Sequence, residues 1–166
     1  MQKIIWGVLL SLGFGGCSQM HMGRVTPLIL DKTKTCAVAP FYNYTQTPLA
    51  GHRAASLTNA IAATRGFNCL VIDMKPSDDL VEDNSKKRET YIALARKKGA
   101  DYLLTGDVLE WRYKSGVDGE PAVGLVLMAI DTRTSKSIYT DSASKSGWGS
   151  SSIGVVAQDL LQELIK

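Results

Sequence analysis

Three groups of residues have types and spacings that could support chemistry. Residues 142–145, Ser-Ala-Ser-Lys, match the pattern S-x-x-K, in which a lysine activates a serine nucleophile for acyl transfer. Asp118 and Glu120 lie two positions apart and could act together as a general acid and a general base. Cys17 follows an apolar N-terminal run and could be acylated on its thiol.

The elements that must position the first two groups argue against catalysis. The serine of S-x-x-K should begin a helix, whereas residues 137–147 are predicted to form a strand. Asp118 and Glu120 fall on a predicted hairpin tip, where a carboxylate stays hydrated and its pKa is hard to tune. His21 and His52 lie in separate elements and do not form a zinc-binding pair. The sequence therefore predicts a protein that is not an enzyme and has no cofactor apart from covalent lipid.

The N-terminus has the layout of a bacterial lipoprotein signal. Lys3 precedes an apolar run at 4–14, two glycines follow, and Cys17 comes next. This layout is typical of secretory signals, and the run is about half of the roughly 20 residues that span a bilayer. Cleavage before Cys17 and acylation, with palmitate among the acyl chains, would anchor the chain; the alternative is an ordinary signal peptide with a chance cysteine. Ser18, where an aspartate would favour the inner membrane, favours the periplasmic face of the outer membrane.

The composition indicates one globular domain without a nucleic-acid function. The chain has 166 residues, 45% of them apolar, and a formal charge of +3. This charge is too weak to indicate a nucleic-acid partner. Removing residues 1–16 takes away Lys3 and lowers the charge by one, to +2. We expect a removed signal at 1–16, a lipidated tether at 17–34 and a single domain at 35–166.

Hydrophobic patterns and turn residues predict eight elements in the order β-α-β-α-β-β-β-α. The first part of this order implies parallel strands joined by right-handed crossovers, whereas the later hairpins are antiparallel. We therefore predict a single α/β domain in which helices pack on a mixed sheet. The predicted strands cover 35–41, 69–73, 100–114, 121–131 and 137–147, and the predicted helices cover 48–65, 89–98 and the segment that follows residue 150.

Local signals refine the bounds and the burial of these elements. Thr47 and Pro48 resemble an N-cap followed by proline at the first helical position. One of the serines at 150–152 should cap the last helix. Residues 69–73 are apolar without alternation, which predicts a strand buried on both faces.

Two cysteines remain after cleavage of the signal, Cys36 and Cys69. Each begins a predicted strand, and the two could reach each other if those strands are parallel neighbours. An oxidising compartment would then permit a disulfide. The alternative is a pair of small buried thiols.

Alternation along 100–114 would place aromatic and charged side chains on opposite faces near the hairpin end. Either the aromatic face packs on the core and the charged face is solvated, or Arg112 meets an acid of a neighbouring subunit. One face would hold Leu103, Asp107, Leu109, Trp111 and Tyr113, and the other would hold Leu104, Val108, Glu110, Arg112 and Lys114.

Two further features have alternative interpretations. Four acids in a predicted loop at 75–88 form either a solvated surface or a mobile acidic lip of a groove or pore. Trp148, between two glycines, is either packed or inserted among lipid headgroups, a place that suits an indole. The four acids are Asp78, Asp79, Glu82 and Asp83.

Three segments, at 40–57, 99–125 and 142–148, together with Cys17, resemble the PelC family of outer-membrane lipoproteins of Pel exopolysaccharide export systems. The run EWRYKSGVDGEPAVG in the second segment is long and specific. The resemblance implies an α/β fold similar to the TolB N-terminal domain and a large, dodecamer-like homo-oligomeric ring. It also implies an electronegative funnel that guides a cationic, partly de-N-acetylated polysaccharide of the biofilm matrix to an outer-membrane porin, PelB.

The resemblance suggests roles for individual residues. A tryptophan at the place of Trp148 is implied to enter the membrane, and Asp118 belongs to the family motif. Acids focused by a ring attract a polycation, but a mature charge of +2 requires those acids to be concentrated on the lumen. The acids of 78–83, or Asp118 with Glu120, are the candidates. The other motif residues are Glu110, Arg112 and Glu120.

A second class of function stays open. A lipid-tethered interaction module similar to TolB or CsgG would bind a protein of a secretion or envelope complex rather than a sugar polymer. Retardation of the protein by the polysaccharide on native gels would separate the two.

Overall fold

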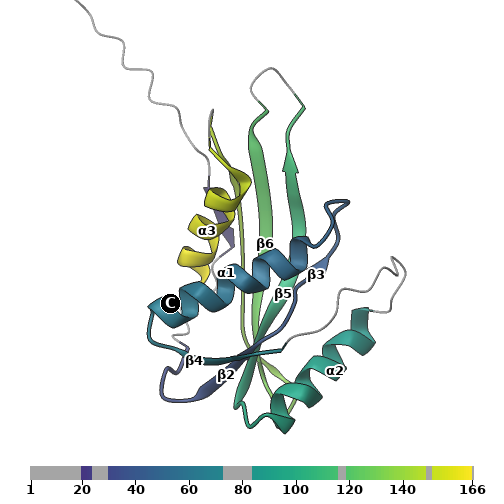
Figure 1. Cartoon of the computed structure of the whole chain (residues 1–166), viewed down its shortest axis with the longest axis vertical. Coiled ribbons are helices and arrows are strands. Elements are labelled where there is room, and N and C mark those ends of the chain that lie inside the picture. Colours follow the sequence, from purple (N-terminus) through teal and green to yellow (C-terminus); the bar gives the residue numbers. More distant parts are fainter. Residues whose placement is uncertain (1–19, 24–29, 73–83, 116–118, 149–150, 166) are drawn as a thin grey trace, which may run out of the picture.

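The computed structural model describes residues 20–23, 30–72, 84–115, 119–148 and 151–165 (Figure 1). Seven strands and three helices are found in these ranges. They are β1 (Met20–Gly23), β2 (Thr35–Val38), β3 (Tyr42–Asn43), α1 (Ala50–Thr64), β4 (Asn68–Val71), α2 (Asn84–Lys97), β5 (Tyr102–Tyr113), β6 (Pro121–Asp131), β7 (Ser137–Ser146) and α3 (Ile153–Leu164).

The strands form one mixed sheet in the order β1-β7-β6-β5-β2-β4, with β3 beside β5. β2 runs parallel to β4 and β5, whereas β5, β6, β7 and β1 pair antiparallel. The predicted single α/β domain is therefore confirmed, and the predicted order of eight elements is found with β1 and β3 added. β1 lies inside the segment predicted to be only a tether, where it pairs with residues 142–145 of β7.

The helices cover the two faces of the sheet unequally (Figure 1). α1 and α3 lie on one face, and the larger hydrophobic core between them and the sheet includes Leu104, Val108 and Trp111. α2 lies on the other face, where a smaller core includes Leu103 and Ile130. The far part of the long β5–β6 hairpin extends beyond α2, so no described helix covers that part of the second face.

The start of α1 differs from the prediction. The helix begins at Ala50, and the preceding Leu49 has a φ of 59° and provides no side-chain cap. The hydroxyl of Thr47 instead donates to the backbone carbonyl of Trp111. The N-cap predicted at Thr47 and Pro48 is therefore wrong, because a long-range contact with β5 uses the hydroxyl that would have capped the helix.

The other two helices follow the predicted pattern, with one changed bound. α3 is capped as predicted, because the hydroxyl of Ser152 accepts a hydrogen bond from the backbone N–H of Val155 at 3.3 Å. α2 begins at Asn84 rather than at residue 89. The prediction missed the first turn because residues 84–88 are polar and show no apolar stripe. The buried residues of α3 are Val156, Ala157, Leu160, Leu161 and Leu164.

β4 is an edge strand, which corrects the prediction that it is buried on both faces. Val71 is exposed, and β2 is the strand that pairs with β4 in the described sheet. The prediction failed because a short apolar run does not distinguish a central strand from an edge strand.

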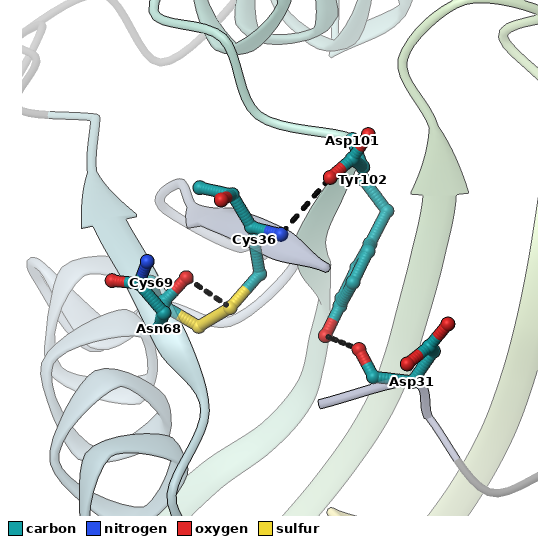
Figure 2. The surroundings of a disulfide bond; sticks show 7 residues. Asp31, Cys36, Asn68, Cys69, Asp101 and Tyr102 are labelled. Atoms are coloured by element: carbon teal, nitrogen blue, oxygen red, sulfur yellow. Dashed lines mark hydrogen bonds between the residues drawn. A yellow bond between two sulfur atoms is a disulfide. The ribbon is translucent and has the colours of Figure 1, made fainter. Parts of the chain in front are cut away.

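A disulfide joins the edge strand to its neighbour (Figure 2). The parallel register places Cys36 directly opposite Cys69, and their Cα atoms are 4.3 Å apart. Cys36 is completely buried. β4 is therefore held to the sheet by a covalent bond as well as by its hydrogen bonds to β2.

Polar contacts near this disulfide fix the start of β2. The hydroxyl of Tyr102 donates to the backbone carbonyl of Asp31 at 3.4 Å, and the carboxylate of Asp101 accepts from the backbone N–H of Thr35 at 3.0 Å (Figure 2). Burial, and then the charges of Asp31 and Asp101, raise the pKa of Tyr102 to about 12. Tyr102 is therefore a neutral hydrogen-bond donor at physiological pH.

Candidate functional site

A bulge in β5 decides which side chains of the hairpin face which side of the sheet. The pairing of β5 with β6 shifts between Val108 and Glu110, so Leu109 is the extra residue. Trp111 therefore returns to the core that contains Val108 and is only 2% exposed. The two faces predicted for 100–114 are wrong beyond this bulge, because one extra residue reverses the alternation.

The aromatic residues beyond the bulge lie on the side of α1 and α3. Trp111 packs in the core as one of the two predicted interpretations required. Tyr113 is 54% exposed, and its hydroxyl accepts a hydrogen bond from the backbone N–H of Ile153 at 3.3 Å. Of these two aromatic residues, Trp111 is thus buried in the core, and Tyr113 is exposed beside the N-terminal end of α3.

Charged residues of the hairpin pair with each other. Nε of Arg112 donates to Oε1 of Glu110 at 2.9 Å, and Nζ of Lys114 lies 3.7 Å from Oε2 of Glu120. These pairs are accessible to water, and such pairs contribute about 0–1 kcal/mol to stability. Within the chain, Arg112 therefore pairs with an acid of its own strand, and contact with an acid of a neighbouring subunit stays a prediction.

A groove of about 1060 Å³ opens on the face of the sheet that α2 leaves uncovered. It lies between the loop at 44–48 and the parts of β5, β6 and β7 that no described helix covers, and its volume is close to the upper limit of about 1,000 Å³ for ligand sites. Glu110 and Arg112 of the predicted motif belong to it. The polar side chains along it include those of Tyr44, Gln46, Glu110, Arg112, Ser142 and Ser144.

The S-x-x-K pattern does not assemble a catalytic pair. Ser142 lines the groove, whereas Lys145 forms an ion pair with Asp159 of α3 on the opposite face of the sheet. A spacing of three residues in a strand places two side chains on opposite faces. The lysine therefore cannot activate the serine.

A second polar cluster, which sequence reasoning missed, links α2 to β5 and β3. Nη2 of Arg88 donates to Oδ1 of Asp107 at 3.0 Å, and the Arg88 guanidinium lies 4.4 Å from the centre of the Tyr42 ring. Burial raises the pKa of the Asp107 carboxyl, with the Arg88 charge opposing this rise. Burial also raises the pKa of the Tyr42 hydroxyl. No local pattern reveals such a cluster, because its members lie on three separate elements.

We expect the Asp107→Asn variant to show a changed pH dependence of the free energy of unfolding in the acidic range that begins near the ordinary aspartate pKa of about 3.9 and extends above it. The raised pKa means that the folded protein binds the Asp107 proton more tightly than the unfolded chain does. Protonation of Asp107 therefore stabilises the wild-type fold as the pH falls through this window, and the variant lacks this contribution. Urea titrations at several pH values within the window measure the difference.

Asp131 provides the matched control for this pH prediction. Hydrogen bonds from Thr134 hold the pKa of the Asp131 carboxyl below its usual value. Asp131 therefore contributes stability that is lost as the pH falls, and Asp131→Asn should shift the pH profile in the opposite direction. Parallel profiles for the wild type and Asp107→Asn would contradict the role assigned to Asp107.

Trp148 lies on the surface at the entry to α3. Its side chain is 62% exposed, and its backbone carbonyl accepts a hydrogen bond from the N–H of Ser151 at 3.1 Å. The packed alternative is therefore not found. Contact of this indole with lipid stays a prediction.

Several predicted site residues lie outside the described residues, so their surroundings are not part of the site described above. Within the described ranges, no group of three or more His, Cys, Asp or Glu side chains is arranged to hold a metal ion. None of the helices in these ranges has the length and apolar character needed to cross a membrane. The residues outside the described ranges are Cys17, Asp78, Asp79, Glu82, Asp83 and Asp118.

Solved structures similar to this chain include PelC from Paraburkholderia phytofirmans. A PelC variant that forms a dodecamer is 28% identical, with a TM-score of 0.73 and coverage of 90% of this chain and 96% of that chain. The PelC dodecamer in another space group is also 28% identical, with a TM-score of 0.70 and coverage of 89% and 96%.

The same fold occurs in the lipoprotein GNA1162 from Neisseria meningitidis. This protein is 18% identical, with a TM-score of 0.56 and coverage of 80% of this chain and 95% of that chain. No protein-family model and no curated protein matches the chain. The similarity to the PelC structures covers about nine-tenths of this chain; this chain is a PelC-like protein.

Proposed function

We propose that this chain is a lipid-anchored protein on the periplasmic face of the outer membrane. In this proposal it assembles into a homo-oligomeric ring and guides a cationic exopolysaccharide of the biofilm matrix to a PelB-like porin. The observation that carries the proposal is the 28% identity to PelC, a dodecamer, over 90% of this chain. The proposed role is guidance rather than catalysis; the serine and lysine of S-x-x-K lie on opposite faces of the sheet and do not form a nucleophile and its base.

The charge distribution of the hairpin bears on where an electronegative funnel would arise. Glu110 and Glu120 each have a basic neighbour, Arg112 and Lys114 respectively, so these acids add little net field. Among the acids of the candidate segments, Asp118 and the four acids of 78–83 would then be the ones to supply a field that attracts a polycation. Because the mature charge is +2, such a funnel would require these acids to be concentrated on the lumen.

Membrane attachment would combine a lipid with an exposed aromatic residue. Acyl chains on Cys17 would supply stable anchoring, since more than one chain is needed for it. The exposed indole of Trp148 would lie at headgroup level, because its ring is apolar and its N–H requires a polar partner.

Native mass measurement of the detergent-extracted, lipidated protein tests the ring and the anchor together. We expect a mass that corresponds to a large homo-oligomer, because the similar PelC structures are dodecamers. Cys17→Ser should move the protein from the membrane fraction to the soluble fraction. A strictly monomeric mass at micromolar concentration would remove the ring from the proposal, and unchanged fractionation of Cys17→Ser would remove the lipid anchor.

Guidance of the polymer predicts a salt-sensitive interaction. A cationic polysaccharide should retard the wild-type protein on native gels at low salt and much less at high salt, where charges are screened beyond about a Debye length. Replacing the four acids of 78–83 by their amides should weaken the retardation, and Asp131→Asn serves as a control that removes one acid elsewhere. Equal retardation of all three proteins would remove the acidic run from the proposed role.

A further inference from the structure

The groove beyond α2 contains hydrogen-bonding groups that the described chain does not use. Glu110 engages Arg112 through Oε1 alone, and Arg112 engages Glu110 through Nε alone. Oε2 of the carboxylate and both terminal nitrogens of the guanidinium have no partner among the described residues. The same is true of the Gln46 amide and of the hydroxyls of Ser142 and Ser144. Donors and acceptors thus converge from two strands and one loop.

Apolar surface lies beside these polar groups. The side chains of Tyr44 and Leu109 are 58% and 56% exposed, and both line the groove. Leu109 is exposed because it is the bulge residue of β5. An exposed ring next to hydroxyl, amide and carboxylate groups suits a ligand that has a C–H face and a hydroxyl edge.

The charge of the groove indicates the charge of its ligand. Glu110 and Arg112 are the charged residues among those that line it, and their formal charges cancel. A polycation or a polyanion would gain little net attraction there. A hydroxyl group, in contrast, both donates and accepts, so it can bond to a carboxylate and a guanidinium that stand side by side.

We propose that this groove is a subsite for a short, uncharged stretch of polysaccharide, such as a run of N-acetylhexosamine units. Hydroxyl and acetamido groups of the sugar bond to Glu110, Arg112 and the two serines, while Tyr44 covers a sugar face. The inference rests on the proposed function in that the ligand is a passing polymer. It adds that uncharged units bind at a site separate from the acids that attract the charged units.

A ligand-observed NMR titration of the full lipidated protein tests the subsite. The probes are an N-acetylgalactosamine tetrasaccharide and its fully de-N-acetylated counterpart. We expect the acetylated probe to bind with an affinity that is insensitive to salt, and Tyr44→Ala and Glu110→Gln each to weaken it about fivefold, the effect of about one hydrogen bond or contact of similar strength.

Tyr113→Ala is the matched control. Tyr113 lies on the opposite side of β5 with an exposure close to that of Tyr44, so its loss should leave the affinity unchanged. No binding of the acetylated probe, or equal effects of Tyr44→Ala and Tyr113→Ala, would overturn the subsite.

Two further outcomes would assign the groove a different role. Binding of the de-N-acetylated probe alone, lost at high salt, would support electrostatic guidance and overturn the subsite. A smaller native mass for Tyr44→Ala, with unchanged sugar affinity, would identify the groove as a contact between subunits and also overturn it. Failure of the proposed function itself would show separately, as a monomeric mass of the wild-type protein or as absent retardation by the cationic polymer.

Discussion

Replacing Trp111 by Ala should lower the free energy of unfolding by about 3–5 kcal/mol. Trp111 is 2% exposed and lies in the core that α1 and α3 form with the sheet. Truncation removes the largest side chain among the fully buried residues and leaves a cavity, into which the surrounding structure relaxes only partially. Urea unfolding followed by far-ultraviolet circular dichroism measures the loss.

Two further variants make the Trp111 prediction specific. Trp148→Ala is the same substitution at a side chain that is 62% exposed, and it should change stability by no more than about 0.5 kcal/mol. Trp111→Phe should cost less than Trp111→Ala, because Trp111 Nε1 has no hydrogen-bond partner among the described residues and phenylalanine loses only volume. Equal losses for Trp111→Ala and Trp148→Ala would show that the hairpin does not contribute to the core.

The double substitution Cys36→Ala/Cys69→Ala should lower the free energy of unfolding by about 2–4 kcal/mol. The disulfide joins positions 33 residues apart and ties β4, at the edge of the sheet, to β2. Without it, the unfolded chain gains conformational freedom, and β4 depends on its pairing with a single described neighbour. Urea unfolding with and without a thiol reductant measures the effect.

The reductant provides the control for this prediction. It should destabilise the wild-type protein by a similar amount and leave the double variant unchanged, since the variant has no disulfide to reduce. A wild-type protein whose stability does not respond to the reductant, even after unfolding and refolding in its presence, would show that the crosslink contributes nothing to the fold.

Elements with strong local signals were predictable from the sequence. The serine cap of α3 and the antiparallel pairing of β5 with β6 depend on signals between near neighbours in the chain, and both predictions are confirmed. β1 and β3 are short, and their formation depends on pairing with distant strands. Segments of four and two residues are too short to show a hydrophobic periodicity, so the sequence could not indicate β1 and β3.

The sequence could indicate which residues belong to the candidate site, but it could not indicate which face of the sheet they lie on. The motif residues Glu110 and Arg112 do lie together on one surface. Their placement opposite Trp111 depends on the bulge at Leu109, which a pattern of alternation does not reveal. The pairing of Arg88 with Asp107 depends on how α2 docks on the sheet, which local sequence does not encode.

The unequal covering of the sheet by helices also bears on how relatives of this chain can diverge. Near α2, consecutive residues of β5 such as Leu103 and Leu104 are buried on opposite faces, so substitutions there must preserve side-chain shape on both sides. Beyond the bulge, no described helix lies over the groove side, and the side chain of Arg112 is exposed there. The exposed positions on the groove side of the hairpin are therefore ones that related proteins can change while the core stays the same.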